Sequence, residues 1–230
     1  IATGDELVQP GEAPNIDQII ASNTFGLFAM LQSVGAEPRM LPIAKDRIGS
    51  LKQSFSLIGQ ADLVVTVGGA SVGDHDLVAK AAEDLGMQQS FYKVAMRPGK
   101  PLMAGKLNGT LMIGLPGNPV SAMVCGERFI VPVIQKMLGL QSIARQKQTA
   151  LLDHDLAKNG PREHYMRAKV IDGYAYVEDR QDSALLSVLA TSNALVVRSP
   201  NEKALKKGSR IQYICLTTAP AGLHKARTSV

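Results

Sequence analysis

Aromatic residues are scarce in this sequence of 230 residues: they make up 4% of it, and tryptophan is absent. Proteins that hold single-stranded nucleic acid usually stack the bases on aromatic side chains. The composition therefore argues against nucleic acid as a partner.

Cysteine and long apolar runs are scarce as well. Two cysteines, Cys125 and Cys215, cannot form a disulfide framework or a four-cysteine zinc site, which favours a reducing compartment. No apolar run reaches the roughly 20 residues that cross a bilayer. Residues 1–7 contain neither an initiator methionine nor the basic start of a signal peptide. We therefore expect a cytoplasmic chain with no membrane contact that begins inside a longer protein.

The two halves of the chain differ in charge and in hydropathy pattern. Residues 1–144 carry 11 Lys and Arg against 12 Asp and Glu, whereas residues 145–230 carry 14 against 8. Helical spacing of apolar residues also gives way to alternation after residue 141. These changes predict two domains, residues 1–143 and 144–230.

The first domain is predicted to be α/β, with a parallel sheet covered by helices on both faces. Residues 63–67 form a continuous apolar run, as a strand buried on both faces does. Apolar residues at helical spacing predict helices at about residues 22–35, 46–59, 76–86 and 119–138, with caps at Ser22, Asp46 and Asp76 and a kink at Pro132.

The second domain is predicted to be small and all-β. Alternating patterns indicate strands at residues 165–170, 174–177, 195–198 and 210–214. The dipeptide Asp172-Gly173 between the first two of these is a strong hairpin signal.

Three segments of the first domain combine glycine or proline with charged or hydroxyl groups. They are residues 68–76, 97–101 and 115–121. Glycine lets backbone N–H groups approach an anion, and proline fixes the turn that directs them. Each segment is expected at the carboxyl end of a strand, where open α/β sheets bind ligands. Together they predict a site for a phosphorylated or oxyanionic ligand.

Each segment also has a plainer interpretation. Asp76 is either a helix N-cap or a ligand of a metal ion beside the anion. Lys93, Arg97 and Lys100 are either anion ligands or charges on a solvated turn, most readily so for Lys100. Asn118 followed by Pro119 is by itself an adequate helix start.

Taken together, residues 3–7, Asn23 and the segments 68–76, 97–101 and 115–121 closely resemble the MoeA family of molybdopterin molybdenumtransferases, which is related to the E domain of gephyrin. The Leu-Pro-Gly-Asn-Pro turn makes the resemblance specific, since the related molybdopterin adenylyltransferases share the double-glycine loop but lack this turn. The resemblance spans most of residues 1–140, and the β-rich remainder fits the family's C-terminal domain by pattern and position.

The resemblance implies a molybdopterin-binding-like fold and a reaction. Adenylylated molybdopterin and molybdate would be converted to molybdenum cofactor and AMP with a divalent metal, taken as Mg²⁺. It further implies a cytoplasmic homodimer, with the molybdopterin adenylyltransferase as another partner.

The resemblance also assigns residues to roles. Glu6, Asp46 and Asp76 would be the catalytic acidic residues, binding metal or positioning molybdate and water. The implied substrate-binding residues are Gly68, Gly69, Ser71, Gly73, Lys93, Arg97, Lys100, Pro116, Gly117, Asn118, Pro119, Ser121 and Arg167. The assignment of Arg167 rests on a less specific motif, in the second domain. Arg97 stands where the family commonly has lysine.

Members of the family carry two further domains before the segment that matches residues 3–7. We therefore expect either a piece of a transferase or a shortened relative. The first would be an enzyme fragment that is inactive alone, and the second a molybdopterin-binding module or scaffold without turnover.

Overall fold

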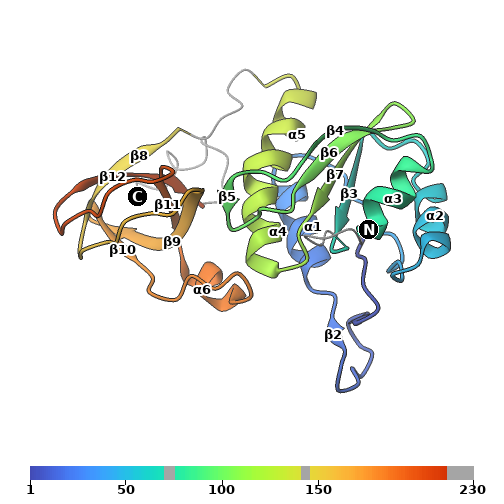
Figure 1. Ribbon diagram of the computed structural model, residues 1–230, viewed down its shortest axis with the longest axis horizontal. Helices are drawn as coiled ribbons and strands as arrows, with labels where there is room; N and C mark the ends of the chain where they lie inside the picture. Colours follow the sequence, from blue (N-terminus) through green and yellow to red (C-terminus); the bar gives the residue numbers. More distant parts are fainter. Residues whose placement is uncertain (70–75, 141–145, 217–230) are drawn as a thin grey trace, which may run out of the picture.

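The computed structural model describes residues 1–69, 76–140 and 146–216. They form an α/β part and a smaller β-rich part (Figure 1). Helices of the α/β part face the β-rich part (Figure 1). The predicted division at residues 143 and 144 falls among residues 141–145, outside the described part, and remains a prediction.

The sheet of the α/β part is mixed, where a purely parallel sheet was expected. Its order is β3-β7-β6-β4, comprising Leu63–Val67, Thr110–Leu115, Met103–Leu107 and Gln88–Tyr92. β3 and β7 are parallel, whereas β6 is antiparallel to both β7 and β4. Two single bridges, Ala2 to Val67 and Thr3 to Ala44, continue the parallel side beyond β3.

The antiparallel pairing has a local cause. Asn108 and Gly109 connect β6 to β7, with φ of 50° and 86°. Positive φ at both central residues is the geometry of a two-residue hairpin turn. This turn forces the chain straight back along the preceding strand.

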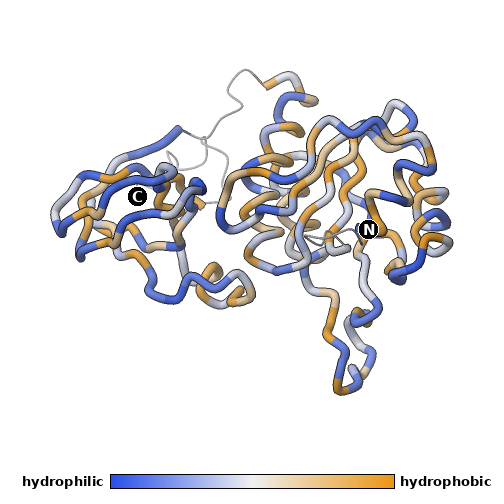
Figure 2. The backbone as a smooth tube through the Cα atoms, viewed as in Figure 1, coloured by the Kyte–Doolittle hydropathy of each residue, from blue (hydrophilic) through white to orange (hydrophobic). Residues whose placement is uncertain are grey.

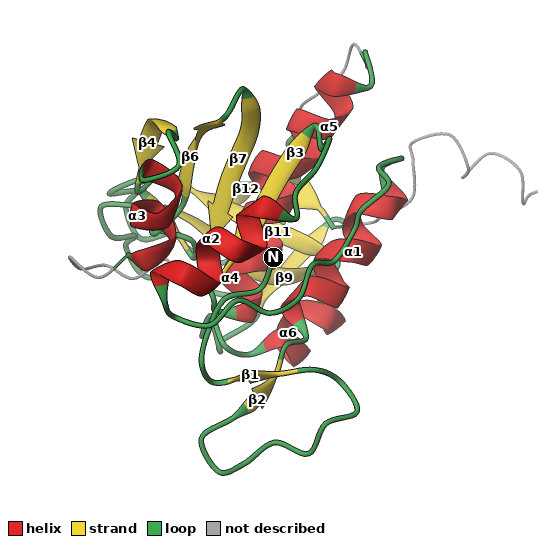
Figure 3. Cartoon of the chain, turned by 90° about the vertical axis from the view of Figure 1, so that its right-hand side faces the viewer, coloured by secondary structure: helices red, strands yellow, loops and turns green. Residues whose placement is uncertain are grey.

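Helices cover both faces of the sheet, as predicted (Figure 3). The core on one face includes α1 (Asn23–Ser33) and α4 (Pro119–Cys125). The core on the other includes α2 (Ile48–Ser56) and α3 (Leu77–Glu83).

Two predicted caps are wrong, because neither side chain caps its helix. Ser22 stands at the N-cap position of α1 but its side chain makes no capping hydrogen bond. Arg47, in extended conformation, takes the N-cap position of α2 in place of Asp46. Near the start of this helix, the Ser50 hydroxyl accepts a hydrogen bond from the Lys45 N–H at 3.0 Å. The Asp46 side chain does not cap the helix.

The predicted kink at Pro132 takes the form of a π-helical segment. The long helix comprises α4, the π segment η1 (Gly126–Ile130) and α5 (Val131–Met137). Proline lacks the N–H that an α-helix needs and its ring crowds the preceding turn. The turn before Pro132 widens accordingly.

The second part is the predicted all-β domain, and it closes into a barrel. Its elements are β8 (Gln148–Leu152), β9 (Glu163–Ile171), β10 (Tyr174–Val177), α6 (Leu186–Thr191), β11 (Ala194–Arg198) and β12 (Arg210–Cys215). The strand order is β10-β8-β12-β11-β9, and β10 also pairs with β9, which closes the ring. The short strand β5 (Met96–Arg97) of the α/β part joins β9 in parallel.

A segment that holds β1 (Leu7–Val8) and β2 (Ile19–Ile20) projects from the body of the molecule (Figure 1). Its isoleucines are exposed: Ile16 is 98% and Ile19 60% exposed. Figure 2, which is coloured by hydropathy, shows this apolar stretch on the projection. Among the described residues, no helix is both long and apolar enough to cross a membrane.

Candidate functional site

Two of the three predicted segments meet at one edge of the sheet. Because β3 and β7 are parallel and adjacent, their carboxyl ends place Gly68 beside Gly117. The Gly68 N–H donates to the Leu115 carbonyl at 3.1 Å, and a Cβ on Gly117 would lie 3.4 Å from the Gly68 Cα. The edge is therefore lined by backbone, as a site for anions requires.

Gly68 and Gly69 are required by this backbone. Their φ angles are 95° and 66°, and a Cβ on Gly68 would lie 2.3 Å from the Thr3 carbonyl oxygen. A Cβ on Gly69 would lie 2.4 Å from Val78 Cγ2. The following residues of this loop, including the predicted Ser71 and Gly73, lie outside the described residues.

Acidic residues gather where the segment after Thr3 meets the segment after Ala44. The Asp46 N–H donates to Asp5 Oδ1 at 3.3 Å, and the Glu6 carboxylate folds back over Gly4, where a Cβ would lie 2.6 Å from its Oε2. Asp5 was not among the predicted site residues, although it lies next to Glu6 in the same motif.

Asp76 is the helix N-cap that its sequence context suggested, while its role as a ligand remains a prediction. Its Oδ1 accepts a hydrogen bond from the Ala79 N–H at 2.9 Å, which caps α3. Its Oδ2 is buried and has no hydrogen-bond partner among the described residues. A cap uses one oxygen, so the second remains available to a ligand.

The acidic residues do not form a metal site by themselves. Within residues 1–69, 76–140 and 146–216, no three His, Cys, Asp or Glu side chains are grouped so that they could hold a metal ion. The assignment of Glu6, Asp46 and Asp76 as metal ligands remains a prediction.

Lys93 directly follows β4 and has an unusual backbone conformation. Its φ is 72°, its N–H donates to the Leu102 carbonyl at 2.8 Å, and its ammonium lies 4.8 Å from the centre of the Tyr92 ring. Burial first, and then the negative charge of Asp76, raise the pKa of Tyr92 to about 12. Lys93 and Asp76 thus both adjoin Tyr92. Lys93, Arg97 and Lys100 are all exposed.

The third cation, Arg97, belongs to a turn wedged between the two parts of the molecule. Gly99, with φ of 110°, packs so closely on α4 that a Cβ there would lie 2.3 Å from Cys125 Sγ. On its other side, Arg97 is paired with His164 in the β5–β9 ladder. The turn therefore directs Arg97 to the junction with the barrel.

Arg167 meets Arg97 at this junction. Its side chain is fully buried, and its Nη2 donates to the carbonyls of Arg180 and Asp182 at 3.2 and 3.0 Å. Within the part of the chain that the structure describes, its Nε and Nη1 have no hydrogen-bond partner. Burial, and next the charge of Arg97, lower the pKa of Arg167. A buried cation facing a second cation, with two unused donors, is suited to an anion.

The same concentration of positive charge acts on His164. Burial lowers its pKa to about 4, with further contributions from Arg97, Arg167, Arg162 and Arg198. His164 is therefore neutral at pH 7, and its buried Nε2 has no hydrogen-bond partner in residues 1–69, 76–140 and 146–216.

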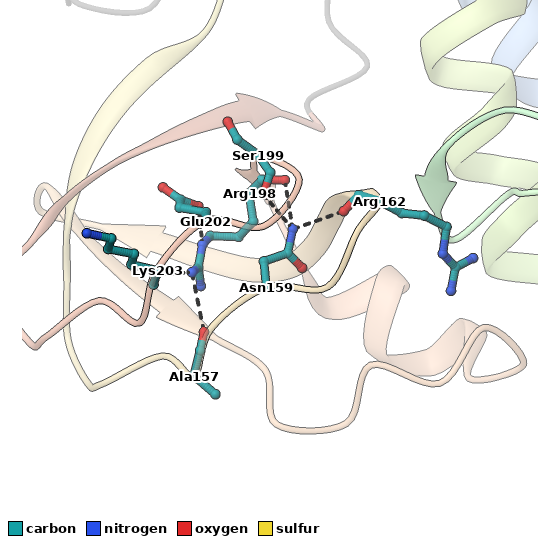
Figure 4. A network of polar contacts seen from close by, with 7 residues as sticks. All are labelled: Ala157, Asn159, Arg162, Arg198, Ser199, Glu202 and Lys203. Atoms are coloured by element: carbon teal, nitrogen blue, oxygen red, sulfur yellow. Dashed lines mark hydrogen bonds and ion pairs between the residues drawn. The ribbon is translucent and has the colours of Figure 1, made fainter.

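A polar network fixes the loops that flank this cluster (Figure 4). The Asn159 amide donates to the carbonyls of Arg162 and Ser199 at 2.9 and 2.7 Å, while the buried Arg198 pairs with Glu202. The Arg162 side chain extends away from the network and donates to the Met96 carbonyl at 3.3 Å. The network thereby anchors a contact with β5.

The turn at residues 116–121 links the two halves of the site. The Asn23 amide donates to the Gly117 carbonyl at 2.6 Å, and the Asn118 amide donates to the Ser183 hydroxyl at 2.9 Å. The Val120 N–H donates to the Ser183 carbonyl at 3.0 Å. Asn118 stands at the N-cap position with proline following it, as predicted, but its side chain reaches the barrel and does not cap α4.

Ser183 was missed by the sequence interpretation. It lies in a stretch with no glycine or proline, and the only local signal is Asp182, whose Oδ1 accepts the Ala184 N–H at 2.8 Å. Pro116, Pro119 and the buried Ser121 lie in or next to the same turn. The contacts thus join the edge of the sheet to Ser183, which follows Asp182, the residue whose carbonyl accepts from Arg167.

Comparison with protein families matches both parts. Residues 1–136 match a probable molybdopterin binding domain, and residues 149–216 match the MoeA C-terminal region, domain IV.

Curated relatives match nearly the whole chain. A molybdopterin molybdenumtransferase of Nostoc sp. is 35% identical over 225 residues, which cover 94% of this chain and 52% of the relative. One from Haemophilus influenzae is 31% identical, with 92% and 54% covered. The chain spans about half the length of the curated relatives it matches.

Solved structures agree. A structure of the molybdopterin biosynthesis MoeA protein of Pyrococcus horikoshii superimposes with a TM-score of 0.82 at 26% identity, covering 94% of this chain and 53% of that one.

Proposed function

The chain belongs to the MoeA family, and from this premise we propose that it supplies the anion-binding part of a site that inserts molybdate into adenylylated molybdopterin with release of AMP. Both substrates are anions, one a phosphoanhydride and the other an oxyanion. The proposal covers the whole protein, of which this chain corresponds to about half of a typical curated relative.

The observation that carries the proposal is the junction of Arg167 with Arg97. Arg167 is fully buried with two unpartnered donor nitrogens, and Arg97 acts on it as a second positive charge. Burial and the charge of Arg97 disfavour the charged form of Arg167, and the charges of Asp182 and Glu178 act in the opposite direction. With molybdate or a phosphate between them, both guanidinium groups gain charge-assisted hydrogen bonds.

The sheet edge would hold the rest of the nucleotide-linked substrate. Gly68 and Gly69, with Ser71 and Gly73, would offer backbone and hydroxyl donors to phosphate, and Lys93 a point charge. The turn formed by Pro116, Gly117, Asn118, Pro119 and Ser121 would shape the wall, and Lys100 would make the smallest contribution.

The acidic residues would bind a cation or a water molecule beside the anionic substrate. Asp76 offers its free Oδ2 to a cation or to a water molecule, while Asp46 and Glu6 lie in the acidic group around Asp5. Bound Mg²⁺ would neutralise phosphate charge. The carboxylates of the described residues do not converge into a Mg²⁺ site.

A second copy of the protein is the proposed partner in a cytoplasmic homodimer. The projecting segment exposes Ile16, Ile19 and Ile20 at 98%, 60% and 44%. Apolar side chains that gather on one projection indicate a contact surface. The molybdopterin adenylyltransferase, which would deliver the substrate, is the further partner that we propose.

The test is a calorimetric titration of the chain with AMP. Lys93→Ala and Arg97→Ala should each weaken AMP binding by about 1–3 kcal/mol, the value of a charge-assisted hydrogen bond, and Lys100→Ala by less. Binding without molybdenum insertion by a complete enzyme would favour the alternative, a molybdopterin-binding module or scaffold. A larger loss from Lys100→Ala than from the other two would contradict the proposed site.

A further inference from the structure

Lys93 is held in a backbone conformation that lysine seldom adopts. Its φ of 72° lies in the left-handed region, which glycine and asparagine favour. The flanking hydrogen bonds, from Lys93 N–H to Leu102 and from Val94 N–H to Lys100, fix this conformation at 2.8 and 3.0 Å. A strained residue in a candidate site calls for a functional explanation.

The strained conformation brings the lysine side chain over its own neighbour. The Lys93 ammonium lies 4.8 Å from the centre of the Tyr92 ring, a distance at which cation–π attraction operates. In the part of the chain that the structure describes, the Lys93 ammonium therefore interacts with the ring of the residue before it.

Tyr92 also faces the carboxylate of Asp76. Hydrogen bonding to Asp76 and its negative charge are among the causes, after burial, that raise the pKa of Tyr92 to about 12. Asp76 is fixed by its capping bond to Ala79, and its Oδ2 is buried. A cation and an anion thus lie on the same tyrosine, yet no ion pair joins Lys93 to Asp76 in the part of the chain that is described.

Opposite charges this close to one tyrosine would attract each other, and an ion pair would occupy both. Each would then be less available to a ligand, because binding would first have to break the pair. The Tyr92 ring provides an alternative partner for the ammonium, and Asp76 adjoins the same tyrosine.

We propose that Tyr92 is a positioning residue that keeps Lys93 and Asp76 apart, so that the lysine stays available to an anion and the aspartate to a cation or water. The inference rests on the proposed function for what these charges bind. The separation itself is a property of the free protein and can be measured without any ligand.

The first experiment measures the coupling of Lys93→Met and Asp76→Asn in urea unfolding of the chain. With Tyr92 present, the two substitutions should change the unfolding equilibrium constant independently, within about twofold. In a Tyr92→Leu background the charges can pair, and we expect a coupling of about three- to fivefold. Equal coupling in both backgrounds would overturn the proposal. Tyr92→Met, which also lacks the ring, replaces Tyr92→Leu if the latter fails to fold.

The second experiment uses AMP as the probe. Tyr92→Phe retains the ring and should bind AMP within twofold of the unmodified chain, whereas Tyr92→Leu should bind it about fivefold more weakly. Phe91→Leu is the matched control, because Phe91 precedes Tyr92 in β4 and is 39% exposed. Equal affinity of the Phe and Leu variants would contradict the role of the ring. No AMP binding by the unmodified chain would overturn the proposed function, and the coupling experiment would still decide the role of Tyr92.

Discussion

At the scale of single residues, the two interpretations of Asp76 are compatible. One carboxylate oxygen caps α3, and the other is buried with no hydrogen-bond partner in the described part of the chain. The sequence context presented these as alternatives, because an N-cap and a ligand draw on the same residue types. In the structure, the capping hydrogen bond uses only Oδ1 of the Asp76 carboxylate.

Substitutions at Asp76 separate the two roles. Asp76→Asn retains a capping oxygen and should leave the free energy of unfolding nearly unchanged, while molybdenum insertion by the full-length protein should be mostly lost. Asp76→Ala should in addition lower the free energy of unfolding by about 1 kcal/mol, the value of a cap. Thermal unfolding and cofactor assays of both variants are the measurements. Near-normal insertion by Asp76→Asn would leave Asp76 as a cap alone.

His164 should make the fold sensitive to acid. Its pKa is lowered to about 4 by burial and by the neighbouring arginines, so the unfolded chain binds its proton at a higher pH than the folded one. Stability then falls as the pH drops from about 6.5 to 4, by at most about 1.4 kcal/mol per pH unit for this group. Urea unfolding at several pH values should show a shallower fall for His164→Gln, with His154→Gln as the control. Parallel curves for the unmodified chain and His164→Gln would contradict this.

At the scale of elements, turns decide where the candidate site lies. The loop after β3 and the turn after β7 meet because those two strands are parallel. Gly68 needs its positive φ and has no room for a Cβ, whereas Gly117 has ordinary van der Waals space.

These two glycines should therefore differ in their tolerance of alanine. Gly68→Ala should lower the free energy of unfolding by at least about 2 kcal/mol, since it adds both backbone strain and a clash with the Thr3 carbonyl. Gly117→Ala should change it by about 0.5 kcal/mol or less. Chemical unfolding of both variants is the measurement, and equal losses would show that the close approach at Gly68 can relax.

Local signals explain which elements the sequence could predict. Asp172-Gly173 identified the β9–β10 hairpin, and both residues have positive φ. Asn108-Gly109 carries the same signal for a hairpin between β6 and β7. The expectation of a sheet that is parallel throughout did not take this signal into account. The pairing of β5 with β9 could not be predicted, because two residues contain no periodicity and the contact depends on how the two parts pack.

The candidate site divides in the same way. The glycine and proline segments were visible because their residue types are specific to turns. Ser183 was not, since its role depends on Asn118 reaching across from α4 to the barrel. The Ser71 part of the first loop lies outside the described residues, so its role remains a prediction.

At the scale of the whole molecule, this chain would supply only part of a shared active site. It spans about half the length of its curated relatives, and we propose that the site also needs the rest of the protein and a second copy.

Complementation tests this sharing. The isolated chain should fold and bind AMP but fail to insert molybdenum. Mixed with a full-length subunit that carries Asp76→Asn, its intact Asp76 should restore partial activity in a heterodimer. The chain with Asp76→Asn is the control and should restore none. Turnover by the purified chain alone would show that the remaining domains are dispensable.

The central claim is that Arg97 and Arg167 share an anion at the junction of the α/β part and the barrel. Tungstate is an anomalous scatterer with the charge and shape of molybdate, so a crystal of the chain soaked with it tests the claim most directly. We predict an anomalous peak within hydrogen-bond reach of the free Arg167 nitrogens and of Arg97, lost in Arg167→Met and kept in Arg210→Met, since Arg210 is an exposed residue of β12. A peak elsewhere, or one that survives Arg167→Met, would contradict the account.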